Sequence, residues 1–191
     1  MLSTLAAHIR RFVTLSDEEE QILAEYIEIR DVKKKDFLLK EGQVCQGNYF
    51  VIKGLCRAYF ETERDGDQTS HFAIETWWIT DYISLESHKP SGFNIQAVEN
   101  TTYAVLYRDT QDKLFAAVPQ LERYFRIILQ RTVAAAHMRV KYLFTKSAEE
   151  RIDHFTALFP EFVQRVPQYM MASYLGFSPE FFSKIRARKK A

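Results

Sequence analysis

PQYMMASYLGFSPEFFSKIRARKKA, residues 167–191, carries the most specific pattern in this chain of 191 residues. Pro167 suits the first position of a helix. Apolar side chains then recur at three- and four-residue spacing, which predicts one short helix: Met170, Met171, Tyr174 and Leu175. We expect Gly176 to end that helix, because glycine adopts the left-handed conformation of a C-cap without steric cost.

A second short helix is predicted directly after this turn. Ser178 is a good N-cap, Pro179 fits the first helical position, and Glu180 places a carboxylate where it suits the helix dipole. We expect three apolar residues to face the core: Phe181, Phe182 and Ile185. The opposite side is expected to present polar and small residues: Glu180, Ser183, Lys184, Ala187 and Arg188.

Two short helices joined by a glycine-containing turn describe a helix-turn-helix, whose second helix can enter the major groove of DNA. Five cations near its end suit phosphate contact: Lys184, Arg186, Arg188, Lys189 and Lys190. A charge run at a chain end is commonly only solvated, and the charges alone leave that alternative open. The turn before them favours double-stranded DNA as the partner. The candidate DNA-binding residues are these cations together with Ser178, Glu180 and Ser183.

The distribution of charge supports this interpretation. The whole chain has 26 basic and 25 acidic residues, a net charge of +1. Residues 1–122 hold 13 basic and 20 acidic side chains, whereas residues 123–191 hold 13 basic and 5 acidic ones. Such asymmetry indicates an anion-binding or nucleic-acid-binding segment in the basic part.

A long helix is predicted upstream of the helix-turn-helix. Apolar residues recur every three or four positions over residues 121–144, which corresponds to about 36 Å of helix. A helix of this length can pair two subunits through a coiled-coil-like seam, so residues 119–144 are the predicted homodimer contact. Packing on its own domain is the alternative. Asp109 is a candidate N-cap for a shorter helix over 110–117.

Residues 30–107 have a sequence pattern typical of an antiparallel β-roll. Short aromatic and β-branched runs over 49–52, 55–60, 69–75, 93–99 and 102–107 are separated by turn formers, with a hairpin signal at 64–67. Before them, Ser16 and Glu19 form a capping-box pattern that begins an amphipathic helix. The expected fold is α+β: a helix and double-stranded β-helix roll over 1–118, the dimerisation helix 119–144, and the helix-turn-helix over 145–191.

Several function classes are excluded by what the sequence lacks. No apolar run is long enough to span a membrane, and the first residues do not resemble a secretory signal. Cys45 and Cys56 are too few for a disulfide framework, so we expect a cytoplasmic protein with thiols buried in its core. None of the five histidines forms the paired motif of a metal-binding roll, and no catalytic fingerprint occurs, so no enzyme activity and no metal are expected.

The whole arrangement resembles the Crp/Fnr family of bacterial transcription regulators. VKKKDFLLKEGQVCQGNYFVIKGLCRAYF, residues 32–60, looks like the first half of a cyclic-nucleotide-binding roll, and ASYLGFSPEFFSKIR, residues 172–186, is similar to the family's DNA-reading unit. KSAEERIDHFTALFPEFVQRVPQ, residues 146–168, looks like the form found in Bacteroidetes-type members. The resemblance implies a DNA-binding homodimer that also contacts RNA polymerase.

The resemblance assigns roles to residues of the second helix. Ser178 would cap it, and Glu180 would accept a hydrogen bond from a cytosine amino group. The family has two base-reading Arg positions in this helix. Lys184 stands at the later one and can donate to guanine, but without the planar fork of Arg. Pro179 stands at the earlier one, so that side-chain contact is lost. The chain ends soon after this helix, so we expect a winged-helix-like unit without a full wing.

The effector pocket departs from the family pattern. Where cyclic-AMP-binding members have a Gly-Glu pair and a later Arg, the segment 76–102 has Thr80, Asp81 and Ser91 or Gly92. Burying a phosphate without a cation or a cradle of N–H groups is costly, so we expect an effector other than a cyclic nucleotide, or none. The candidate pocket residues are Trp78, Thr80, Asp81, His88, Lys89, Ser91 and Asn94.

A second hypothesis also accounts for the basic tail. The chain would then be a ligand-binding module whose helical tail docks a protein partner instead of DNA. Salt dependence distinguishes the two hypotheses, because each phosphate neutralised on DNA releases counterions and makes binding weaken steeply with salt.

Overall fold

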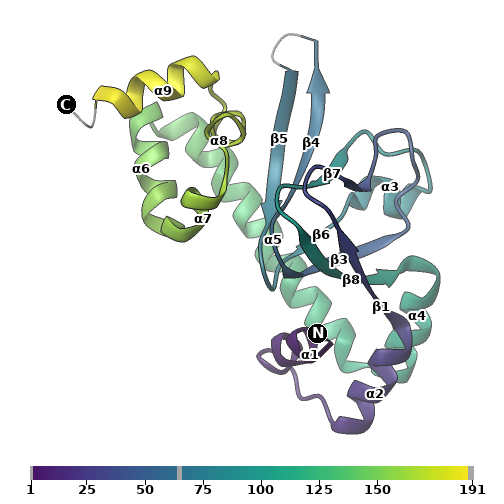
Figure 1. Cartoon of the computed structure of the whole chain (residues 1–191). Helices are drawn as coiled ribbons and strands as arrows, with labels where there is room; N and C mark the ends of the chain where they lie inside the picture. The colour runs from purple at the N-terminus through teal and green to yellow at the C-terminus, as the bar shows by residue number, and fades with distance from the viewer. Residues whose placement is uncertain (1, 64–65, 189–191) are drawn as a thin grey trace. The chain divides into compact units, whose positions relative to one another are not determined.

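The computed structural model describes residues 2–63 and 66–188, without the side chain of Arg186. Two compact units make up the chain (Figure 1). The first comprises residues 1–58 and 72–130, and the second comprises 59–71 and 131–191. The division therefore falls inside the long helix and places the ends of two strands with the C-terminal helices.

The first unit begins with α1 (Leu2–Arg10) and α2 (Asp17–Tyr26). The predicted capping box starts α2: Glu19 N donates to Ser16 Oγ at 3.2 Å, and Ser16 N donates to Glu19 Oε2 at 2.8 Å. The capping-box prediction is confirmed, while α1 is a separate helix that the sequence interpretation did not resolve.

Antiparallel strands form the roll, as predicted. Within the described residues the strand orders are β1-β8-β3-β6 and β2-β7-β4-β5. The strands are β1 (Ile27–Val32), β2 (Phe37–Leu39), β3 (Gly47–Lys53), β4 (Cys56–Thr62), β5 (Gly66–Ala73), β6 (Trp78–Ile79), β7 (Asn94–Ala97) and β8 (Thr101–Tyr107). A short helix, α3 (Tyr82–Ser87), lies between β6 and β7. Of the hairpin signal at 64–67, Arg64 and Asp65 lie outside the described residues, and Gly66 has a φ of +66°.

Two apolar cores stabilise this unit. One lies inside the roll and includes Cys45 and Cys56, both buried as expected. Burial raises the pKa of the Cys56 thiol to about 12, which keeps it protonated and unreactive. The other core packs α1, α2 and the start of the long helix against β3 and β8, with Leu121 and Tyr124 fully buried.

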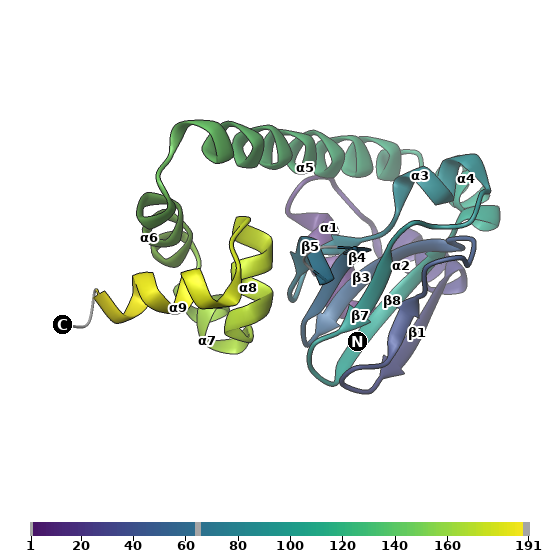
Figure 2. The same ribbon diagram turned by 90° about the horizontal axis from the view of Figure 1, so that it is seen from above.

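Two helices follow the roll. α4 (Arg108–Ala117) has Tyr107 at its N-cap position, so the prediction of Asp109 as the cap is wrong; its carboxylate lies in the first turn, where the dipole also favours it. α5 (Gln120–Thr145) confirms the predicted long helix, which runs unbroken over 26 residues (Figure 2). Among the described helices, none combines the length and apolar character that crossing a membrane requires.

The second unit contains the end of α5, residues 59–71 of β4 and β5, and four shorter helices. These are α6 (Ala148–Leu158), α7 (Pro160–Arg165), α8 (Gln168–Leu175) and α9 (Pro179–Arg188). Ser147 and Glu150 form a second capping box at α6. Pro167 occupies the N-cap position of α8 and not its first helical position, a one-residue correction to the prediction.

Candidate nucleic-acid interface

The turn between α8 and α9 has the predicted geometry. Gly176 is left-handed, with a φ of +79°, and its N–H donates to Ser173 O at 3.1 Å. Phe177 N then donates to Ala172 O at 2.9 Å, which satisfies another carbonyl at the end of α8. A side chain at position 176 would be strained because of this backbone conformation.

α9 starts at the predicted cap. Ser178 Oγ accepts from Phe181 N at 3.2 Å, and Pro179 is the first helical residue. Hydrogen bonds from the main chain and from Ser178 lower the pKa of the Glu180 carboxyl below its ordinary value, so Glu180 is an acceptor at neutral pH.

The inward face of α9 differs from the prediction at one position. Phe182 and Ile185 are buried, but Phe181 is 47% exposed, so its assignment to the core is wrong. At 100° per residue, Phe181 lies about 40° from Ile185 and about 100° from Phe182 around the helix. Phe182 and Ile185 fill the core, and Phe181 lies at the edge of this buried face, where about half of it is exposed.

The outward face of α9 presents the residues expected there. All of them are exposed: Glu180, Ser183, Lys184, Ala187 and Arg188. The remaining candidate DNA-binding groups, the side chain of Arg186 together with Lys189 and Lys190, lie outside the described residues.

Arg151 of α6 stabilises the turn. Its Nη1 donates to Leu175 O at 3.2 Å, and its guanidinium lies 4.3 Å from the centre of the Phe177 ring. Phe177 in turn contacts Phe181, with ring centres 5.5 Å apart. A cation and two contacting rings thus connect α6 to the first turn of α9.

The hairpin segment of β4 and β5 contacts α8 through Ser173. Thr69 N donates to Ser173 Oγ at 2.7 Å, and that hydroxyl donates to Asp67 O at 2.7 Å. Gln68 Nε2 donates to Ser173 O. The sequence holds no local signal for this contact, since it joins residues more than 100 positions apart.

Arg139 of α5 binds the same hairpin and α8. Its Nη2 donates to Tyr174 O at 2.8 Å and to Thr69 O at 3.3 Å, and its Nη1 donates to Ser70 O. The guanidinium also lies 4.3 Å from the centre of the Tyr174 ring. Burial lowers the pKa of this guanidinium from its ordinary value. Arg139 therefore joins three elements of the second unit through main-chain carbonyls and one aromatic ring.

An apolar stripe, which we call the α5 seam, runs along the exposed side of the long helix. Its members follow one another at intervals of four, three, four and three: Leu129, Val133, Ala136, Val140 and Leu143. Val133 and Val140 are 50% and 52% exposed. This is the spacing of a and d positions in a coiled coil.

Two predicted effector residues, Asp81 and Ser91, are hydrogen-bonded to each other in the roll, and the neighbouring Thr80 has its own main-chain partner. Asp81 Oδ1 accepts from Ile83 N at 2.9 Å and Ser84 N at 3.3 Å, and its Oδ2 accepts from Ser91 Oγ at 2.7 Å. Thr80 Oγ1 donates to Gly47 O at 2.9 Å. The Asp81 carboxylate thus occupies the N–H groups at the start of α3, where a bound anion would otherwise be held.

The other predicted effector residues have separate partners. Asn94 Oδ1 accepts from Glu41 N at 3.0 Å, and the His88 ring lies 3.2 Å from an Arg108 nitrogen. The carbonyl of Lys89 accepts from Ser84 Oγ, while its side chain is exposed. Trp78 is directed to the second core, where its Nε1 donates to Tyr124 Oη at 2.8 Å.

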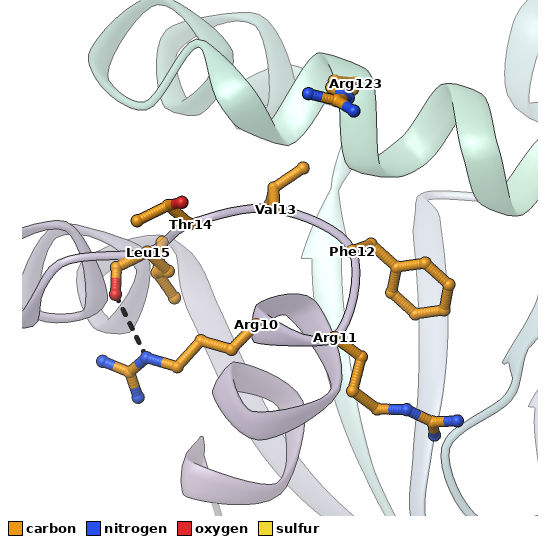
Figure 3. Close-up of a pocket in the computed structure, with 7 residues that line it drawn as sticks. All are labelled: Arg10, Arg11, Phe12, Val13, Thr14, Leu15 and Arg123. Carbon is orange, nitrogen blue, oxygen red and sulfur yellow. Dashed lines mark hydrogen bonds between the residues drawn. The ribbon is translucent and has the colours of Figure 1, made fainter.

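A surface groove of about 490 Å³ lies elsewhere, between the loop after α1 and α5 (Figure 3). It is lined by residues 10–15 and Arg123. Arg10 turns to Leu15 O and also pairs with Asp17 at 3.0 Å and Glu20 at 2.6 Å. Because carboxylates already neutralise Arg10, it contributes little attraction for an anionic ligand.

Comparison with known proteins identifies similar regulators. No protein-family model matches the chain. It is 25% identical over 171 residues to the transcriptional activator protein Anr of Pseudomonas protegens. The matched region covers 83% of this chain and 69% of Anr.

Solved structures show the same fold. FixK2 from Bradyrhizobium japonicum superposes with a TM-score of 0.70 at 19% identity, over 85% of this chain and 83% of FixK2. A CRP/FNR-family transcriptional regulator from Thermus thermophilus gives a TM-score of 0.67 at 17% identity, over 84% of both chains. The chain is therefore similar in sequence to a transcriptional activator and in fold to regulators of the Crp/Fnr type.

Proposed function

We propose that a homodimer of this protein reads a two-half-site operator by placing α9 of each subunit in the major groove. The observation that carries the proposal is the exposed side of α9, where Glu180, Lys184 and Arg188 project from a helix capped by Ser178. Glu180 would accept from a cytosine amino group, and Lys184 would donate to guanine. Ser183, Arg186, Lys189 and Lys190 would contribute base-edge or phosphate contacts.

The α5 seam is the proposed contact between subunits. Its spacing matches a two-stranded coiled coil, and two parallel copies would bury the exposed valines against one another. A symmetric dimer presents two recognition helices, whose half-sites lie about one DNA turn apart. RNA polymerase is the proposed protein partner, because the relative Anr is named a transcriptional activator. We place this activity in the cytoplasm.

The roll is proposed to respond to an effector other than a cyclic nucleotide, or to none. A cyclic phosphate would meet the Asp81 carboxylate at the start of α3 and would have to displace it from two main-chain amides. An effector of other chemistry would act by favouring the DNA-competent form of the dimer, which requires different affinities for the two forms. The Bacteroidetes-type affiliation stays a prediction.

Lys184→Ala is expected to relax base preference. The variant should lose about 1–3 kcal/mol of discrimination at one base pair and little affinity for random DNA. Operators selected from genomic fragments, followed by fluorescence anisotropy on specific and random duplexes over a salt series, measure both quantities. Lys141→Ala, which removes an exposed cation from α5, is the matched control.

Two results would contradict this assignment. Equal losses on specific and random DNA would reduce Lys184 to a phosphate contact. Binding of any DNA that does not weaken with salt would favour the protein-docking module instead.

Asp81→Ala is expected to destabilise the first unit by about 0.5–2 kcal/mol, because α3 loses its N-cap. Asp81→Asn keeps an oxygen acceptor and should cost less. Urea unfolding followed by tryptophan fluorescence measures both, since Trp77 and Trp78 lie in this unit.

Calorimetric titration of the wild type with cyclic AMP should give no saturable heat. Saturable binding would contradict the proposal that Asp81 already occupies the main-chain amides at the start of α3.

A further inference from the structure

We propose that Phe181 reads the methyl group of a thymine in the major groove, beside the polar contacts of Lys184. The inference rests on the proposed role of α9 and adds to it a residue that determines specificity. The class of ligand is a T·A base pair, recognised by apolar contact with its C5 methyl group.

The exposure of Phe181 is the first observation. Phe181 is 47% exposed, while the two other large apolar residues of α9, Phe182 and Ile185, are only 3% and 4% exposed. Phe181 is the third residue of α9. In helix-turn-helix proteins the N-terminal residues of the second helix approach the base edges.

Its position relative to the cations is the second observation. Phe181, Lys184 and Arg188 follow one another at intervals of three and four, so they lie along one side of the helix. Lys184 and Arg188 are exposed. DNA that approaches these two cations therefore also approaches the Phe181 ring.

The support beneath the ring is the third observation. Phe181 packs on Phe177, with centres 5.5 Å apart and planes inclined by 49°. Phe177 lies under the Arg151 guanidinium, which is also anchored on Leu175 O. The ring is thus held before binding, which lowers the entropy lost when it contacts a partner.

The chemistry selects thymine among the bases. In the major groove the edges of adenine, guanine and cytosine carry hydrogen-bonding groups, and thymine adds the C5 methyl. Phenylalanine has no donor or acceptor and suits that methyl group. The neighbouring cations Lys184 and Arg188 can bind guanine and phosphate groups.

The test combines a change in the protein with the removal of one methyl group. Full-length wild type and Phe181→Ala are titrated with the operator selected by this protein and with duplexes in which each thymine is replaced singly by deoxyuridine. We expect one position per half-site where deoxyuridine weakens wild-type binding about 3- to 10-fold. At that position Phe181→Ala should bind the thymine duplex as weakly as the wild type binds the deoxyuridine duplex. The variant should lose no further affinity when thymine is replaced by deoxyuridine. Phe181→Leu should retain part of the discrimination.

Controls separate this inference from the proposed function. Tyr169→Ala removes a ring that is 51% exposed on α8 and should leave the deoxyuridine effect unchanged. Circular dichroism confirms that each variant is folded. If the losses from Phe181→Ala and deoxyuridine multiply at every position, or Phe181→Ala leaves affinity unchanged, the reading of thymine is overturned while DNA binding stands. If the wild type shows no salt-sensitive DNA binding, the proposed function fails as well.

Discussion

Val133→Glu combined with Val140→Glu is expected to convert the protein to a monomer and to weaken binding of a two-half-site operator about 100-fold or more. In a symmetric dimer each seam residue meets its own copy, so the variant places like charges in an apolar contact. The two half-sites would then be bound independently, without the gain from linkage. Analytical ultracentrifugation measures the mass, and anisotropy on full and half operators measures the affinity.

Met138→Glu provides the matched control for the seam. Met138 is 41% exposed but lies about half a turn from the seam on the same helix. The same charge there should leave the dimer and its affinity intact. A double variant that remains dimeric, or a Met138→Glu variant that dissociates equally, would locate the subunit contact elsewhere.

The elements that the sequence predicted are those determined by local chemistry. Ser16 and Ser178 each cap a helix through an N–H group three residues ahead, and Gly176 ends α8 through its own backbone. α5 followed from its apolar period. Interactions within a few residues leave a direct trace in the sequence, and these predictions were confirmed, although Asp109 was wrongly predicted as a cap.

The missed strands depend on partners distant in the chain. β1 pairs with β8, whose residues lie 69 to 79 positions later, and the two-residue strand β6 pairs with β3. β6 is too short for a recognisable alternation. Phe181 was assigned to the core because it is aromatic, yet it lies at the edge of the buried face of α9, on which Phe182 and Ile185 are buried.

The effector residues show why a residue alignment does not define a pocket. Asp81 and Ser91 are joined by a hydrogen bond and Thr80 bonds Gly47 O, so all three use their polar groups within the chain itself. Trp78 points to the second core while the adjacent Ile79 points into the roll, because neighbouring strand residues face opposite sides. The resemblance to the family assigned these residues to one pocket because they lie in one segment. In the structure, neighbouring residues of that segment face opposite sides and contact different partners.

Arg139→Ala is expected to destabilise the second unit by about 2–4 kcal/mol, since hydrogen bonds from a charged donor contribute about 1.5–3 kcal/mol and the carbonyls left behind are partly buried. The carbonyls of Thr69, Ser70 and Tyr174 would lose their donor, and Tyr174 would lose a cation over its ring. For a chain of this size the melting temperature should fall by roughly 5–15 °C. Thermal unfolding by circular dichroism measures the loss.

Local measurements distinguish the role of Arg139 from a general loss of helix stability. Arg126→Ala removes an exposed arginine from the same helix and should change the free energy of unfolding by less than about 0.5 kcal/mol. Hydrogen exchange should accelerate in Arg139→Ala at residues 67–70 and 173–175 before it does so in β3 and β8. Ser173→Ala should produce the same local pattern with a smaller loss, because it removes the hydroxyl that joins Thr69 and Asp67. If Arg139→Ala behaves like Arg126→Ala, the hairpin contact does not hold α8, and the first helix of the DNA-reading unit is stabilised by its own core alone.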